Sequence, residues 1–195
     1  MTTSTATAQR RGRPAAASRD DVLAAALQRY LRGRRIDVQA IATELGLGRT
    51  TIYRWFGSRE GLIGEVLFRA AEPLLEAARR SARGRGGPAL LETFDRFNRS
   101  LADAPALRQF LEQERDAALR IITSSGGGLQ PRIVAGIAGL IENEVRAGNY
   151  DAPVEPATLA YAIVRLAEAF SSTTRRPGCA ATSTGSARSK PRSSA

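Results

Sequence analysis

Apolar residues recur at helical spacing through most of the chain, from about residue 18 to residue 170. Side chains three and four positions apart lie on the same face of an α-helix, so this spacing predicts a series of amphipathic helices around a shared core. No segment shows the strict alternation of apolar and polar residues that is typical of a half-buried strand. The sequence therefore predicts an all-α protein.

The chain begins its helical part with one longer helical pattern, and two short helical patterns follow it. Asp37 can cap a helix that ends near Leu45, and Gly46 can end it in a left-handed conformation. The second short helix covers residues 49–56, and Gly57 stops it. Two short helices joined by a tight turn after a supporting helix form a helix-turn-helix pattern. Its predicted inner core is apolar and consists of Leu27, Leu31, Val38, Ile41, Leu45, Leu47, Ile52 and Phe56.

The opposite face of the 49–56 helix carries hydroxyl, guanidinium and aromatic groups. Arg side chains can pair with two acceptors of guanine, while Thr and Tyr reach bases, thymine methyl groups or phosphates. This composition favours a helix that reads the DNA major groove, although a solvated or packed face would show the same spacing. The outward residues are Arg49, Thr50, Thr51, Tyr53, Arg54 and Trp55.

The positive charge of the chain is concentrated at its two ends. The formal net charge is +10, but the first nineteen residues carry four Arg and no acid, and residues 171–195 carry four Arg, one Lys and no acid. Residues 1–17 lack apolar periodicity, which predicts a disordered basic arm. Its Arg10, Arg11 and Arg13 could lie in a minor groove beside the helix-turn-helix, or form a solvated tail.

The composition argues against most catalytic chemistry. The chain has one Cys and no His, which excludes the usual metal sites and the nucleophiles that depend on a histidine base. We therefore expect no enzyme activity, no cofactor and no metal site. No apolar run has membrane-spanning length and the N-terminus has no secretory leader, so we expect a cytoplasmic protein with no membrane contact.

The segment IDVQAIATELGLGRTTIYRWFGSREGLIGEVL resembles the DNA-binding half of the TetR family of bacterial regulators. The resemblance covers about residues 18–67. It implies that the third helix enters the major groove and that the start of the fourth helix contacts phosphate. By position, the implied base-reading residues are Arg49, Thr50, Thr51, Tyr53 and Arg54, and the implied phosphate contacts are Thr43, Tyr53, Trp55, Ser58 and Arg59.

Two positions depart from the family pattern, because Gly48 stands where a capping Ser is frequent and Arg59 replaces a frequent Lys. The overall layout and the Arg-rich arm also resemble the branch that controls degradation of quorum-signal lactones. The resemblance implies a repressor that binds a palindromic operator as a homodimer and is released by a small, largely apolar ligand. A ligand-independent or architectural DNA-binding protein is the alternative, and a helical enzyme is a more remote one.

The predicted domains are residues 18–64 for DNA binding and residues 65–170 for ligand binding and dimerisation. Helical patterns in the second domain cover about residues 89–102, 106–122, 131–147 and 156–170, and Pro73 should kink the helix before them. An apolar stripe at helical spacing is more often plain core than a pocket. The candidate ligand-binding residues are Phe94, Phe97, Leu101, Phe110, Leu111, Tyr161 and Arg165.

Residues 171–195 have no apolar stripe, which predicts a disordered basic tail in place of a last packed helix. The Arg, Ala and Gly content indicates a GC-rich gene. A single-base slip in such a gene is a second explanation for the missing apolar stripe. Reading one base upstream turns TCN serine codons into codons for Leu, Ile, Val or Phe. Five of the resulting apolar positions lie within about 140° on a helix. We therefore predict a frameshift near residue 171, which would impair dimerisation.

Overall fold

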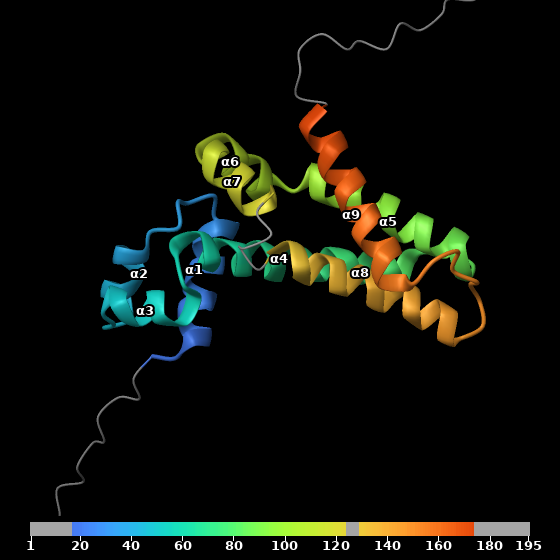
Figure 1. Ribbon diagram of the computed structural model, residues 1–195. Coiled ribbons are helices and arrows are strands. Elements are labelled where there is room, and N and C mark those ends of the chain that lie inside the picture. The colour runs from blue at the N-terminus through green and yellow to red at the C-terminus, as the bar shows by residue number, and fades with distance from the viewer. Residues whose placement is uncertain (1–16, 124–128, 174–195) are drawn as a thin grey trace, which may run out of the picture.

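The computed structural model describes residues 17–123 and 129–173, and all regular elements within these ranges are helices, as the sequence predicts (Figure 1). The predictions for the arm with Arg10, Arg11 and Arg13, and for the tail beyond Thr173, concern residues outside these ranges. The helices are α1 (Arg19–Leu31), α2 (Val38–Glu44), α3 (Arg49–Phe56), α4 (Arg59–Ser81), α5 (Gly86–Asp103), α6 (Pro105–Gln113), α7 (Arg115–Thr123), α8 (Leu129–Arg146) and α9 (Pro156–Thr173).

Side-chain caps set the start of the first two helices. The Ser18 hydroxyl accepts from the backbone N–H of Asp21 at 3.2 Å, and the Asp21 carboxylate accepts from the N–H of Ser18 at 2.7 Å. This reciprocal capping box satisfies backbone donors that have no partner within the helix. At α2, Asp37 accepts from the N–H groups of Gln39 and Ala40, as predicted.

Two glycines with positive φ separate α2, α3 and α4. Gly46 has a φ of 64° and Gly57 a φ of 75°, a region that other residues enter only at a cost. The Ser58 hydroxyl then accepts from the N–H of Gly61 at 3.0 Å and caps α4. The turns predicted from the sequence are therefore present at both places.

The helix-turn-helix core continues into α6 and α7. Ile52 is fully buried and Phe56 is 9% exposed, and they share one cluster with Phe110 of α6 and Ile121 of α7. Tyr30 meets Phe110 edge to face, with ring centroids 6.2 Å apart. α6 and α7 therefore pack directly against residues 18–64, the predicted DNA-binding unit.

The prediction that Leu31 belongs to this core is wrong, because its side chain is 55% exposed. Tyr30 takes the inward position at the end of α1, where it contacts Phe110. Leu27, Leu45 and Leu47 pack against the core while remaining partly exposed.

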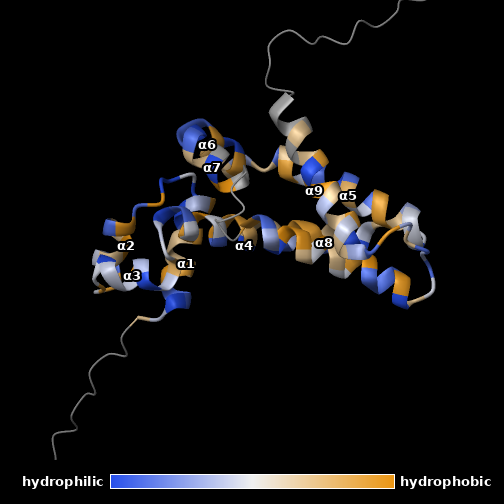
Figure 2. Cartoon of the chain, in the orientation of Figure 1, coloured by the Kyte–Doolittle hydropathy of each residue, from blue (hydrophilic) through white to orange (hydrophobic). Residues whose placement is uncertain are grey.

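The long helix α4 links the two ends of the molecule (Figure 1). It continues through Pro73 as one helix, so this proline does not end it. A second apolar cluster lies beyond, where Leu90 of α5, Ile141 of α8 and Ala160 of α9 are buried together. Figure 2 shows apolar residues along the inward parts of α4 and α8. None of the helices in the described ranges has the length and apolarity of a membrane span.

The single helix predicted over residues 106–122 is wrong, because the structure divides it into α6 and α7 at Glu114. The backbone of Glu114 leaves the helical region, with φ −133° and ψ 44°. Its side chain is only 6% exposed and is held by arginines from the DNA-binding unit. A long-range ion pair therefore accompanies the break, a contact that helical periodicity does not reveal.

Candidate nucleic-acid interface

Helix α3 presents one polar face to solvent. Ile52 and Phe56 point into the core, which leaves Arg49, Thr50, Tyr53 and Arg54 exposed and Thr51 half-buried. The structure thus brings together the five residues predicted to read bases. Two guanidinium groups, hydroxyls and a phenol on an exposed helix of a helix-turn-helix suit contacts with base edges and phosphates.

A shallow pocket of about 260 Å³ adjoins this face and extends it toward the loop before α2. Its lining includes Arg49 and Tyr53 of α3 together with Arg35 and Gln39. Arg35 has a 73% exposed side chain. The sequence prediction missed Arg35 and Gln39, although the adjacent arginines at positions 34 and 35 were a local signal.

Two further predicted phosphate contacts, Thr43 and Ser58, are exposed. The Thr43 hydroxyl donates to the carbonyl of Gln39 one turn earlier at 3.0 Å. The Ser58 hydroxyl caps α4. Both hydroxyls have these intramolecular bonds and still lie at the surface.

Trp55 is less accessible than predicted. Its side chain is half-buried and packs against the first core cluster. The indole therefore contributes to packing between α3 and the rest of the DNA-binding unit, and only part of it faces solvent.

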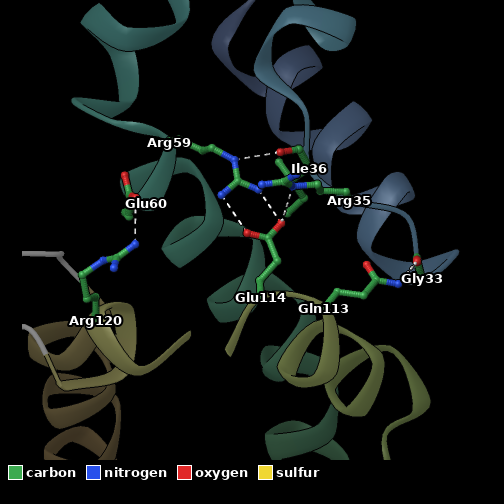
Figure 3. Close-up of polar contacts among 8 residues, drawn as sticks. All are labelled: Gly33, Arg35, Ile36, Arg59, Glu60, Gln113, Glu114 and Arg120. Atoms are coloured by element: carbon green, nitrogen blue, oxygen red, sulfur yellow. Dashed lines mark hydrogen bonds and ion pairs between the residues drawn. The ribbon is translucent and has the colours of Figure 1, made fainter. Parts of the chain in front are cut away.

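Arg59 is engaged within the protein, and its contact with DNA phosphate stays a prediction. Its guanidinium donates to both carboxylate oxygens of Glu114, through Nη1 at 2.8 Å and through Nη2 (Figure 3). Its Nε donates to the carbonyl of Ile36 at 3.0 Å. Arg35 adds a further contact to Glu114 at 3.3 Å.

This ion pair changes the ionisation of both partners. The hydrogen bond with Glu114 raises the pKa of Arg59 further above its ordinary value. Burial alone would raise the pKa of Glu114, but hydrogen bonding and charge from Arg59, with a smaller effect of Arg35, bring it below its ordinary value. Both groups are therefore held in their charged forms.

The residues predicted to bind a ligand are distributed over several environments. Phe110 is a core residue at 7% exposure, and Leu111 packs beside it in the first cluster. Phe94 packs against the second cluster, and Phe97 and Leu101 of α5 are half-buried. Tyr161 and Arg165 of α9 are exposed. The structure does not gather the seven residues around one cavity in the part of the chain it describes.

The larger hollow that the structure shows lies elsewhere, between α1, α4 and α8. This groove has a volume of about 710 Å³ and lies between the DNA-binding unit and the C-terminal half. Its volume is within the range of small-molecule sites. Its apolar lining includes Leu23, Leu27, Phe68, Leu75 and Leu140.

Comparison with known proteins agrees with this architecture. Residues 85–174 match the family model for the tetracyclin repressor-like C-terminal domain. A solved structure, the R. erythropolis transcriptional repressor QsdR from the TetR family, superposes with a TM-score of 0.75. The two sequences are 28% identical, and the match covers 81% of this chain and 85% of the QsdR chain. No curated protein matches the sequence. The helix-turn-helix at one end, the matched C-terminal domain at the other and the superposition over most of both chains show that this protein is similar, in its fold and in its C-terminal domain, to the TetR family of DNA-binding transcriptional regulators.

Proposed function

We propose that the protein is a repressor that reads a palindromic operator through α3 and is released by a small, largely apolar effector. The observation that carries this proposal is the exposed face of α3, where Arg49, Thr50, Tyr53 and Arg54 surround a buried Ile52 and Phe56. The repressor QsdR, with a similar fold, supports the direction of regulation. The narrower assignment to the branch that controls quorum-signal lactone degradation stays a prediction.

The proposal includes a homodimer, since two recognition helices on a palindrome need a two-fold partner. Large apolar side chains are exposed on the last two described helices, Val145 on α8 at 39%, Tyr161 on α9 at 53% and Leu166 on α9 at 60%. Their exposure supports a protein interface on α8 and α9. Leu166→Arg should therefore shift the monomer–dimer equilibrium, measured by sedimentation velocity, toward the monomer. Leu91→Arg, at a leucine of α5 that is 71% exposed, is the matched control.

Release by an effector requires a ligand that prefers one conformer of the protein. The groove between α1, α4 and α8 supports this part of the proposal, because a molecule bound there would contact both the DNA-binding unit and the C-terminal half. The predicted residues Phe94, Phe97 and Leu101 on α5 remain an alternative lining.

Fluorescence anisotropy on the intergenic DNA beside the gene, with a scrambled duplex as control, tests the proposed function. Arg49→Ala and Tyr53→Ala should weaken binding to the intergenic duplex far more than binding to the scramble. Arg99→Ala removes an equal charge at an exposed site on α5 and should change neither. Equal losses on both duplexes would rule out base reading by α3.

The alternative function, an architectural DNA-binding protein, has a distinct signature. Its binding would ignore sequence and fall steeply with salt, because phosphate contacts alone would provide the affinity. Tight binding to the intergenic duplex at physiological salt, with discrimination against the scramble, would exclude it.

We further propose that the reading frame is lost near residue 171. The apolar stripe that TCN serine codons would encode in the shifted frame supports this, and the C-terminal family match extends only to residue 174. Sequencing the gene in this and a sibling strain tests the proposal. An insertion or deletion near codon 171 is the expected result, and an identical frame in both strains would contradict it.

A further inference from the structure

Arg59 lies between an arginine-rich surface pocket and the buried carboxylate of Glu114. On one side it lines the pocket that also contains Arg35, Arg49 and Tyr53, beside the exposed face of α3. On the other side it forms the bidentate ion pair with Glu114, whose side chain is 6% exposed. Figure 3 shows the guanidinium directed toward the carboxylate. A charge in this position can interact with DNA or with Glu114, and one guanidinium cannot make both sets of bonds fully.

Glu114 belongs to the joint between α6 and α7. Its N–H donates to the carbonyl of Phe110 and its carbonyl accepts from Ala118, so its backbone ends one helix and starts the next. The adjacent Gln113 side chain donates to the carbonyl of Gly33, in the loop after α1, at 3.1 Å. On the other flank, Arg120 of α7 lies 3.9 Å from Glu60 of α4. The position of the joint therefore determines where the Glu114 carboxylate sits relative to Arg59.

We infer that Glu114 is a positioning residue that withholds Arg59 from DNA phosphate, so that the α6–α7 joint and the DNA backbone compete for the same guanidinium group. A movement of the joint away from the DNA-binding unit releases Arg59 toward the pocket and adds a phosphate contact. This inference rests on the DNA binding of the proposed function but does not require an operator of defined sequence.

The inference fixes the sign of a measurable effect. Each phosphate contact steepens the dependence of log K on log salt by about 0.9. While Glu114 holds Arg59, that arginine contributes little to the slope. Removing the charge of the Glu114 carboxylate should therefore steepen the slope by about 0.9 for each bound subunit. When the salt concentration falls from 200 to 50 mM, the affinity then rises by an additional factor of about three to four for each freed arginine.

The experiment measures the affinity of the full chain for the intergenic duplex and for the scrambled duplex across this range of salt. Glu114→Gln keeps the shape of the side chain and removes its charge, and it should steepen the slope on both duplexes. Glu60→Gln is the matched control, since it adds the same charge one residue from Arg59 at a carboxylate that faces Arg120. The double variant Glu114→Gln/Arg59→Gln should return the slope to that of the wild type.

Three results would overturn the inference. One is a Glu114→Gln variant that binds less tightly with an unchanged slope, which would show a purely structural role. Another is an Arg59→Gln variant, in the presence of Glu114, that loses about 0.9 of slope per subunit, which would show a direct phosphate contact. The third is a slope gain in Glu60→Gln equal to that in Glu114→Gln.

A measurement on the unaltered protein does not depend on how the variants fold. Because Glu114 keeps Arg59 in the unaltered protein, hydrogen exchange of the backbone amides of residues 110–118 should change little when either duplex is added. A marked acceleration there would show that DNA draws Arg59 from Glu114 and would contradict the inference. Discrimination between the two duplexes is a separate readout, so a loss of sequence preference would count against the proposed function and not against the competition for Arg59.

Discussion

At the scale of single residues, the junction between α3 and α4 depends on a glycine in a confined position. A Cβ atom added to Gly61 would lie 2.1 Å from the carbonyl oxygen of Phe56, closer than any ordinary contact. That oxygen belongs to the backbone at the end of the recognition helix and cannot rotate away as a flexible side chain could. Close packing of two helix ends therefore requires glycine here.

We predict that Gly61→Ala lowers the free energy of unfolding by about 1–3 kcal/mol, the range for overpacking in a well-packed site. Thermal or urea unfolding measures the change. Gly48→Ala, at a position with nothing within 4 Å of an added Cβ, is the matched control and should have a much smaller effect. Equal stability of Gly61→Ala and the control would show that the junction can move apart at little cost.

Single residues also show how far sequence reasoning reaches. The caps at Ser18, Asp37 and Ser58 were predictable because each bonds to backbone within three residues. The ion pair of Arg59 was not predictable from the sequence, because its partner Glu114 lies 55 positions away. The candidate DNA-reading face could thus be identified from α3 alone, while the engagement of one predicted phosphate ligand depended on tertiary contacts.

At the scale of helices, α1, α4 and α8 are joined through one carboxylate. Glu65 of α4 accepts from Arg19 of α1 at 2.9 Å and pairs with Arg132 of α8 at 2.6 Å. Arg19 also stacks over the Phe56 ring, with its guanidinium carbon 4.5 Å from the ring centroid. Burial alone would raise the pKa of Glu65, but the two arginines, with Arg132 the stronger, hold it below the usual value of 4.5.

We predict that this link weakens in acid. A carboxylate whose pKa is lowered by folding stabilises the protein above its unfolded pKa, and that contribution disappears as the pH falls through the folded pKa. The stability advantage of the wild type over Glu65→Gln should therefore be constant above pH 4.5 or so and decrease at lower pH. Urea unfolding at several pH values measures it.

The control for this prediction is Glu72→Gln, which alters an exposed carboxylate on the same helix, 3.4 Å from Arg69. Its stability difference from the wild type should be small at every pH, since exposed pairs contribute little. A wild-type advantage over Glu65→Gln that persists unchanged to strongly acidic pH would contradict the role of Glu65.

Helix boundaries were predicted well where local chemistry sets them and poorly where a distant contact does. α3 spans the predicted residues 49–56 because Gly48 and Gly57 flank a short apolar face. The break between α6 and α7 was missed because residues 106–122 keep helical spacing across it. Its cause lies in the ion pairs of Glu114 with two arginines of the DNA-binding unit.

At the scale of the whole molecule, the first core cluster extends over both predicted domains. It contains Ile41 and Ile52 of the helix-turn-helix and also Phe110, Ala118 and Ile121 of α6 and α7. The predicted boundary between residues 64 and 65 falls inside α4. Elements that bury their apolar surface in one cluster unfold together, because separating them would expose that surface.

We predict one cooperative unfolding transition that both ends of this cluster report. Trp55 is the single tryptophan of the chain and packs against the cluster, so its fluorescence follows the DNA-binding unit. Its urea midpoint should coincide with that of far-ultraviolet circular dichroism, which follows all helices. Phe110→Ala on α6 should shift both midpoints together and reduce stability by about 3–5 kcal/mol.

Leu91→Ala is the control for this prediction, because Leu91 is 71% exposed and should contribute little. A Trp55 transition that is separate from the circular dichroism transition, or unmoved by Phe110→Ala, would show that the DNA-binding unit folds independently.

The core that α1–α3 share with α6 and α7 limits how such a regulator can be rebuilt or diversify. A chimaera that grafts only residues 18–64 onto another effector domain would leave Tyr30 without Phe110 and Arg59 without Glu114. The smallest transplantable part is therefore discontinuous in sequence. Under the proposed function, new operator preferences arise by substitution on the surface of α3, whereas recombination must carry the α6–α7 segment along with α3.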